Sequence, residues 1–234
     1  MSLEALSPDA TTQPRGTMAD SVYTQLRTAI LELRLLPGVG ISEAEVARHL
    51  GVSRQPVREA FGRLARTGYL RVQPQRRTEV VKISVQEVRN ARFIREALEV
   101  AVVREACQRD VGELVGRLEA NLELQRAAQL KDDRHTFHLE DDEFHRLIAQ
   151  GAGCGFAWQL IDEQKAQMDR LRFLSLAFGQ PAVYEDHVAI FEAIKARDGE
   201  AADLAMRTHL GRINDHLVRL RVEFDQYFDD SDAG

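Results

Sequence analysis

Cysteine is scarce in this sequence, which contains only Cys107 and Cys154 among 234 residues. Two cysteines do not make the disulfide framework of a small secreted domain, so we expect a reduced, cytoplasmic protein. Long hydrophobic runs are also missing: no stretch approaches the roughly 20 apolar residues of a transmembrane helix, and no signal-peptide pattern is present. The sequence therefore predicts a protein that does not enter a membrane.

Charge is distributed unevenly along the chain. Residues 18–82 carry 11 Lys and Arg against 6 Asp and Glu, a net charge of +5, whereas residues 83–234 carry 19 against 29, a net charge of −10. A basic module followed by an acidic one is expected when only the first module touches phosphates, although a chance fluctuation gives the same split.

The stretch Ile41–Arg71 has the pattern of two short helices joined by a tight turn. Ser42 followed by Glu45 is a capping-box pattern at the start of the first helix, and Gly51 supplies the turn. Ser53 is expected to cap the second helix. These features predict a helix-turn-helix.

The second of these helices has two different faces. Arg54, Gln55 and Arg58 lie together near its N-terminal end, where long hydrogen-bonding side chains of a recognition helix enter the major groove. Arg63 and Arg66 lie further along and are placed to meet phosphates. Apolar residues at helical spacing form the face that we expect to be buried: Val57, Ala60, Phe61 and Leu64.

The flanking segments complete the module. Residues 1–17 are rich in small and polar residues and are expected to form a disordered tail. The apolar spacing over 18–35 predicts a third helix that packs behind the helix-turn-helix. Two β-prone runs, 69–72 and 78–83, predict a β-hairpin around a polar turn.

The segment LGVSRQPVREAFGRLARTGYL resembles the winged helix-turn-helix of GntR-family bacterial transcription regulators. The resemblance implies that Arg54, Gln55 and Arg58 contact a double-stranded DNA operator. Family wings usually carry an Arg-Gly pair at the tip, and Arg77 occupies the glycine position here, so we expect its side chain to reach the DNA. Ala44 is a second departure, because relatives often have a DNA-contacting arginine there.

From residue 84 to about 228 the pattern is helical, with six helices expected at 84–108, 111–130, 132–150, 154–178, 181–197 and 199–227. The expected fold class is therefore mainly α: a winged helix-turn-helix with a small β-hairpin wing at 18–83, and an all-α six-helix bundle at 84–228. Residues 229–234 are expected to be a disordered tail. This order resembles the FadR-type subfamily with its FCD ligand-binding domain, and six helices resemble the VanR-like branch.

The FCD resemblance implies a divalent metal site. The family pattern Asp-x-x-Phe-His, followed by an acidic residue and His and later by His-Leu, matches Asp141, His145, His187 and His209. Three imidazoles and one carboxylate suit Zn, Ni or Mn and leave room for a further ligand. Other candidates remain open: His135, His138 and His216 as nitrogen donors, Asp142 as an alternative carboxylate, and Cys154 as a soft ligand without family support.

In metal-binding FCD domains the effector is usually a small organic acid whose carboxylate completes the coordination. Arg95 matches an arginine of the family pattern and is the candidate to hold this carboxylate, although a structural ion pair with Glu99 is an equal alternative. The resemblance thus implies a non-enzymatic, homodimeric DNA-binding regulator, a repressor by family habit, controlled by a small carboxylate at a metal. Two alternatives stay open: a metal-sensing regulator, and a metal-dependent hydrolase attached to a DNA-binding module. Against the hydrolase, the sequence has no His-Glu-x-x-His motif.

Overall fold

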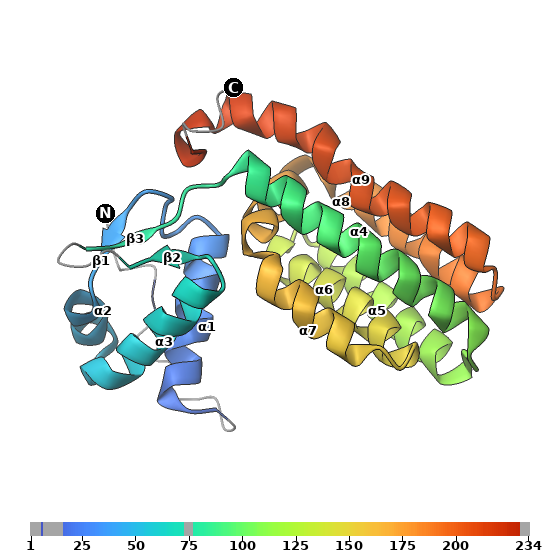
Figure 1. Cartoon of the computed structure of the whole chain (residues 1–234), viewed down its shortest axis with the longest axis horizontal. Helices are drawn as coiled ribbons and strands as arrows, with labels where there is room; N and C mark the ends of the chain where they lie inside the picture. Colours follow the sequence, from blue (N-terminus) through green and yellow to red (C-terminus); the bar gives the residue numbers. More distant parts are fainter. Residues whose placement is uncertain (1–5, 7–15, 73–76, 230–234) are drawn as a thin grey trace. The chain divides into compact units, whose positions relative to one another are not determined.

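The computed structural model describes residue 6 and residues 16–72 and 77–229, with the side chains of all of these except 177–180. It divides into two compact units (Figure 1): one runs to Val85 and resumes at Phe224, and the other spans Gln86–Glu223. Helices predominate among the described residues and the strands form one small sheet, so the prediction of a mainly α fold is confirmed. None of the described helices is long and apolar enough to cross a membrane.

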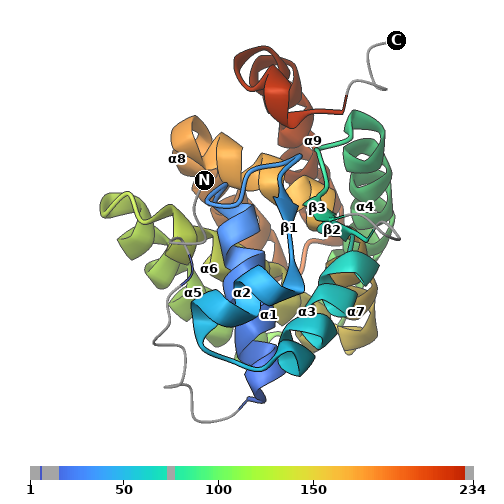
Figure 2. The same cartoon turned by 90° about the vertical axis from the view of Figure 1, so that its left-hand side faces the viewer.

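The N-terminal unit is built on three helices and a small sheet (Figure 2). Its elements are α1 (Met18–Leu31), β1 (Gly40–Ile41), α2 (Glu43–Leu50), α3 (Arg54–Arg66), β2 (Leu70–Arg71), β3 (Thr78–Val80) and the 3-10 turn η3 (Asp225–Tyr227). A capping box of Thr17 and Asp20 begins α1, which packs against α3. This helix ends four residues earlier than predicted, and Leu33 beyond it has a positive φ of 57°.

The sheet has one more strand than the predicted hairpin. Its order is β1-β3-β2, all antiparallel, with Gly40 opposite Glu79 and Leu70 opposite Val80. The additional strand β1 contains only two residues, too few to produce the alternation by which a strand is recognised. The predicted wing tip, residues 73–76, lies outside the described residues.

The helix-turn-helix follows its local signals with one exception. The Ser42 side chain accepts a hydrogen bond from the Glu45 backbone N–H, and Gly51 ends α2 with a φ of 66°. Ser53 occupies the N-cap position of α3, but its side chain makes no capping hydrogen bond. An N-cap side chain bonds the second or third N–H of a helix, and the third residue here is Pro56, which has no N–H to donate.

The second unit contains six helices, the predicted number, but two of its boundaries were wrong. The helices are α4 (Val85–Gln108), α5 (Gly112–Leu130), α6 (Arg134–Gly151), α7 (Gly155–Gln164), α8 (Ala166–Lys195) and α9 (Gly199–Glu223). The break expected near Pro181 is absent and lies instead at Lys165. Helix α8 packs along α9 and α5, and this packing offsets the roughly 3 kcal/mol cost of a proline inside a helix.

The chain returns to the N-terminal unit after α9. The Ile83 backbone N–H donates to the Tyr227 carbonyl at 2.9 Å, and the Asp229 N–H donates to the Ile83 carbonyl at 2.9 Å. Phe228 forms a parallel bridge with Ile83 and is 1% exposed. Helix α9 therefore ends at Glu223 rather than at 227, and residues 224–229 group with the N-terminal unit instead of the bundle.

Candidate nucleic-acid face and metal centre

One end of α3 presents three polar side chains to solvent. Arg54, Gln55 and Arg58 are all exposed, while the opposite side of the helix is buried in the N-terminal unit. Glu43 at the start of α2 lies 3.3 Å from the guanidinium groups of both Arg54 and Arg58. This carboxylate holds the two arginines side by side and is a weak competitor for any anion that approaches them, because all three groups face water.

Two further arginines of this unit have different surroundings. The side chain of Arg77 is 67% exposed, and its guanidinium lies 3.0 Å from a carboxylate oxygen of Glu45. Arg63 instead donates to Asp20 at 2.6 Å and lies 4.1 Å from the centre of the Tyr23 ring. Arg63 is therefore engaged inside the unit, whereas Arg77 extends from its surface.

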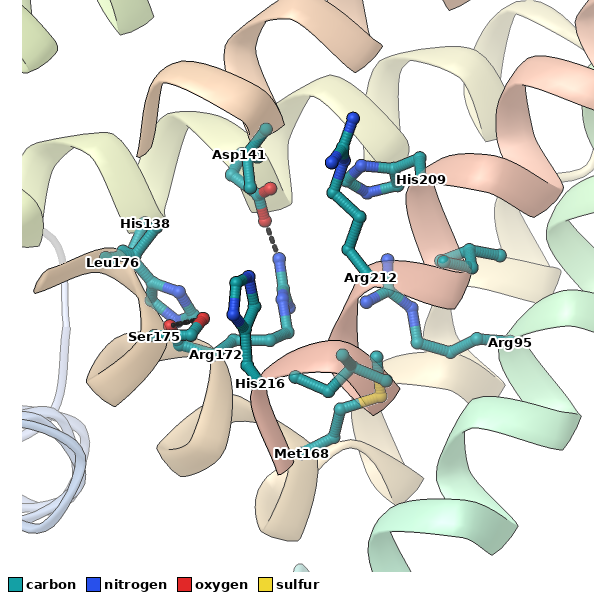
Figure 3. Close-up of a pocket in the computed structure, with 13 residues that line it drawn as sticks. Arg95, His138, Asp141, Met168, Arg172, Ser175, Leu176, His209, Arg212 and His216 are labelled. Carbon is teal, nitrogen blue, oxygen red and sulfur yellow. Dashed lines mark hydrogen bonds and ion pairs between the residues drawn. The ribbon is translucent and has the colours of Figure 1, made fainter. Parts of the chain in front are cut away.

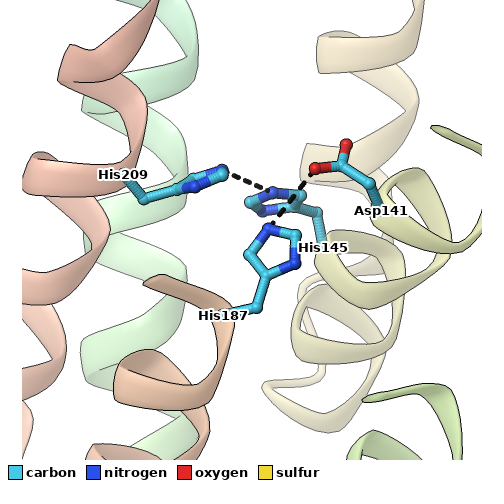
Figure 4. Close-up of side chains that lie close together, drawn as sticks. All are labelled: Asp141, His145, His187 and His209. Atoms are coloured by element: carbon cyan, nitrogen blue, oxygen red, sulfur yellow. Dashed lines mark hydrogen bonds and ion pairs between the residues drawn. The ribbon is translucent and has the colours of Figure 1, made fainter. Parts of the chain in front are cut away.

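Four side chains of the bundle converge on one buried point (Figure 4). Asp141 and His145 come from α6, His187 from α8 and His209 from α9, and one ligand atom from each lies within 4.8 Å of all the others. All four residues are buried. One carboxylate and three imidazoles at this spacing are a donor set for a divalent transition metal.

Each imidazole has an oxygen acceptor beside its Nδ1 atom. The distances are 2.5 Å from His145 to Glu99, 2.7 Å from His187 to Gln125, and 3.7 Å from His209 to Asp186. A carboxylate or amide oxygen only accepts, so at His145 and His187 the ring proton lies on Nδ1 and the Nε2 lone pair points to the common centre. Metal-binding histidines are commonly oriented in this way. The longer distance at His209 is an electrostatic contact and not a hydrogen bond.

Basic side chains or amides hold these acceptors in turn. Arg95 donates to Glu99 at 2.5 Å, and Arg212 donates to Asp186. Burial alone raises the pKa of Glu99, but the charge of Arg95 and the hydrogen bonds from Arg95 and the His145 ring outweigh it and hold the pKa well below its usual range. Glu99 is therefore a carboxylate, suited to accept the Nδ1–H of His145.

The contacts among the four residues favour a cation at their centre. The Nε2 atoms of His145 and His209 are 3.1 Å apart, and Nε2 of His187 is 3.4 Å from Asp141. If each of these two rings carries its proton on Nδ1, the facing Nε2 atoms present lone pairs to each other, an arrangement that a metal ion would relieve. Burial lowers the pKa of His209 to about 4 and that of His187 well below 6.5, which keeps both rings neutral and able to bind a metal.

A small cavity of about 40 Å³ adjoins this centre (Figure 3). Asp141 and His209 line it together with Arg95. Arg172 enters from α8, and its guanidinium contacts the Asp141 carboxylate. The rest of the wall is mainly apolar and includes Met168, Leu176, Val183, Leu210 and Ile213. This is the composition of a small-ligand pocket, apolar with a few placed polar groups.

Comparison with known proteins assigns both units. Residues 18–80 match the bacterial regulatory proteins of the gntR family, and residues 91–212 match the FCD domain. The HTH-type transcriptional repressor RspR of Escherichia coli K12 is 39% identical over 217 residues, covering 92% of this chain and 95% of its own. The chain belongs to the GntR family. A regulator from Streptomyces ambofaciens is 35% identical over 209 residues, 88% of each chain.

Solved structures of GntR-family regulators share the fold. McbR/YncC from E. coli superposes with a TM-score of 0.71 at 22% identity, covering 91% of this chain and all of that one. A GntR regulator from Rhodococcus sp. RHA1 gives 0.72 at 22% identity, over 86% of this chain and 97% of that one. This chain is thus a DNA-binding transcription regulator of the GntR family, with an FCD domain and a His/Asp cluster inside it.

The structure brings together the four residues that the resemblance predicts to bind a metal, while two of the other candidates, His138 and His216, line the adjoining cavity. Among the described residues, the four-member cluster contains neither Asp142 nor any other histidine. Asp142 instead contacts Lys165 and Arg172. Cys154 is the N-cap of α7 and packs against the bundle core. Arg95 forms the ion pair with Glu99, and it also lines the cavity; whether it holds an effector remains a prediction.

Sequence reasoning did not find the residues that orient the imidazoles. Gln125 and Asn121 sit on α5, where nothing local distinguishes them from other polar residues. Asp186 had a signal, because it is the acidic residue directly before His187 in the family pattern, yet it serves His209 instead. Glu99 was considered only as a partner of Arg95, and its second contact with His145 depends on how α4 packs against α6.

Proposed function

We propose that this GntR-family protein is a cytoplasmic, homodimeric repressor whose operator affinity is controlled by a small organic acid bound at a divalent metal. Zn, Ni or Mn is the expected ion, held by Asp141, His145, His187 and His209. The observation that carries the proposal is the buried convergence of these four donors, each imidazole with an acceptor beside its Nδ1 atom. Six bundle helices support placement in the VanR-like branch.

The acid is the expected effector because of what borders the donor set. Arg95 is 1% exposed, and its Nη2 atom has no hydrogen-bond partner within the described structure, although its Nε donates to Glu99. A buried guanidinium with an unused donor beside a cavity is suited to a carboxylate. A divalent ion at the centre would supply the second positive contact for the same carboxylate. Arg95 would then both orient His145 through Glu99 and position the acid.

The exposed end of α3 is the expected DNA contact. The exposure of Arg54, Gln55 and Arg58 at the N-terminal end of α3 supports their role in base contacts. The exposure of Arg77 supports a contact with the DNA backbone or minor groove. The E. coli relative named a repressor supports the same direction of control here. A homodimer would read two half-sites, and the exposed Val218 and Val222, one turn apart on α9, are candidates for a surface between copies.

Control requires that the acid prefer one arrangement of the protein over another. Its contacts would involve α4 through Arg95, α6 through Asp141, and α9 through His209. We expect acid binding to draw these helices together. The acid then shifts the equilibrium away from the operator-binding form by as much free energy as the difference between its affinities for the two forms.

The test measures operator binding by fluorescence anisotropy, using DNA from upstream of the gene, for chelated protein, metal-loaded protein, and metal-loaded protein with a panel of small acids. A change in affinity with an acid only when metal is present supports the proposal. Metal alone changing the affinity identifies the ion as the signal, the metal-sensor alternative. Protein that binds no metal stoichiometrically, or no DNA, refutes it.

His187→Ala separates the parts. It should abolish metal binding and any response to acid while leaving DNA binding by the metal-free protein intact, because His187 lies in the bundle and not in the N-terminal unit. A variant that keeps full metal occupancy would show that the ligand set is wrong.

A further inference from the structure

His138 is a buried histidine that the proposed metal site does not use. It is 1% exposed, lines the cavity, and its Nε2 atom has no hydrogen-bond partner among the described residues. Figure 3 shows His138 beside Ser175 at one side of the cavity and Arg95 at the other. A buried ring nitrogen without a partner costs free energy unless something outside the fold satisfies it.

A second metal ion is not the group that satisfies it. His138 does approach the carboxylates of Asp142 and Asp169, which makes a three-member cluster. However, the Lys165 ammonium contacts both of these carboxylates, and so does the Arg172 guanidinium. Two cations already neutralise two acids there, so a further divalent ion would meet net repulsion.

The charge around the cavity limits what kind of acid fits. The four charged residues that line it, with the groups paired to them and to those partners, form a network of three ion-pair groups that contains five carboxylates and four cations. Its members are Glu99, Asp141, Asp142, Asp169 and Asp186, with Arg95, Lys165, Arg172 and Arg212. Asp162 also approaches Lys165, but it is 57% exposed and water screens its charge.

This network carries a net charge of −1, and a divalent metal ion makes it +1. One carboxylate then brings the site to neutrality, whereas a second would restore an uncompensated buried negative charge. Among the described residues, no cation on the side of the cavity near His138 lacks a carboxylate partner, because Lys165 and Arg172 each contact three carboxylates. That side does offer the His138 nitrogen and the Ser175 hydroxyl oxygen, whose proton is donated to the Arg172 carbonyl.

We propose that His138 is a specificity-determining residue of the effector pocket, and that the effector is a small monocarboxylic acid with a neutral hydrogen-bonding group, a hydroxyl or carbonyl, at its far end. This rests on the proposed function. The carboxylate faces the metal and Arg95, the apolar wall contacts the carbon chain, and the neutral group meets Nε2 of His138. The cavity is small, about 40 Å³, so the acid is short.

The experiment uses matched acids on metal-loaded full-length protein, by isothermal titration calorimetry. Butyrate, 4-hydroxybutyrate and succinate share a four-carbon chain, and propionate, 3-hydroxypropionate and malonate share a three-carbon chain. Terminal hydroxyls are chosen because a 2-hydroxyl would chelate the metal itself. At one chain length the hydroxy acid should bind at least tenfold more tightly than both its unsubstituted and its dicarboxylate counterparts, a difference of about 1.4 kcal/mol.

Variants assign the preference to His138. His138→Leu should bring the affinities of the hydroxy acid and the unsubstituted acid within threefold of each other, while the affinity for the metal alone stays within threefold of wild type. His138→Gln keeps a hydrogen-bonding group and should retain part of the preference. His135→Leu makes the same chemical change on the same helix at a residue that does not line the cavity, and it should retain all of the preference. Circular dichroism checks that each variant is folded.

The outcomes separate the two proposals. Tightest binding by the dicarboxylate at both chain lengths, or an undiminished preference in folded His138→Leu, overturns the role of His138 and leaves the metal-assisted effector site standing. If no acid of the panel binds metal-loaded protein, the inference falls together with the proposed effector.

Discussion

Replacing Gln125 with leucine would remove the acceptor that fixes the orientation of one metal ligand. Asn121 donates to the backbone carbonyl of Glu140 at 3.0 Å, which leaves its own Oδ1 to accept from Gln125 Nε2 at 2.7 Å. The remaining Gln125 oxygen therefore faces Nδ1 of His187 at 2.7 Å. This series of hydrogen bonds gives His187 a protonated Nδ1 and an Nε2 lone pair, and a leucine at position 125 would break it.

The magnitude follows from the burial of the pair. Loss of a partner behind a metal-binding histidine costs about 10–100-fold in metal affinity, or about 1.4–2.7 kcal/mol. Gln125 and His187 are both 0% exposed, so no water replaces the lost acceptor and we expect an effect of about 100-fold. The metal-free protein should also lose about 1–3 kcal/mol of stability, because two buried polar atoms are left without partners.

The assay is competition for Zn against a chelating dye, with urea unfolding of the metal-free protein measured in parallel. Gln150→Leu is the control. It makes the same glutamine-to-leucine change on the exposed surface of α6, and Gln150 contacts none of the four residues of the cluster. A folded Gln125→Leu variant that binds Zn with an affinity within threefold of wild type would falsify the orienting role of these hydrogen bonds.

Three further changes test other parts of the molecule. Arg58→Ala should weaken specific operator binding by about 1–3 kcal/mol in fluorescence anisotropy, while Glu43→Gln should not weaken it, because Glu43 competes for the same guanidinium. Burial lowers the pKa of His138 from 6.5 to about 4, so the unfolded chain takes up the proton first and stability is lost as pH falls from 6.5 to 4. His138→Leu should remove up to about 3 kcal/mol of that loss in urea titrations of metal-free protein, and an unchanged pH profile would contradict the assignment. Phe228→Ala should lower the unfolding free energy by about 3 kcal/mol, measured by circular dichroism in urea, because its ring is buried; wild-type stability would show that the contact with Ile83 contributes nothing.

The helix-turn-helix was readable from the sequence because its determinants are local. Capping residues, a glycine at positive φ and a four-residue apolar repeat each act within one or two turns, and Ser42, Gly51 and Phe61 carry those signals. Strand β1 and the partial failure of the Ser53 cap were not readable in the same way. Strand β1 depends on pairing with a strand about 40 residues away. The Ser53 cap depends on a conflict between two favourable signals, an N-cap serine and a proline, Pro56, in the first turn.

In the bundle, the four residues that converge were expected from a family pattern, and the residues beside their imidazoles were not. Gln125 approaches His187 only because α5 and α8 pack together, a contact between residues 62 positions apart. Pro181 misled the prediction for a related reason: a local breaker signal was overridden by packing along the length of α8. Local physics thus predicted elements, whereas contacts distant in sequence decided how the site is completed.

The return of the chain to Ile83 gives the helical bundle two attachment points rather than one. Helix α4 leaves the N-terminal unit directly after Ile83, and α9 re-enters it at Phe224, so the bundle is an insertion between neighbouring backbone segments. A domain on a single linker swivels about it freely, but an inserted one twists only by straining both connections. Helix α4 carries Arg95 and α9 carries His209. A change in the spacing of these two helices would therefore act on the two chain segments that are hydrogen-bonded to each other, at Ile83 and at Tyr227–Asp229. The proposed acid, in contact with both of these helices, would therefore act on the N-terminal unit through two covalent connections, one at each end of the inserted bundle.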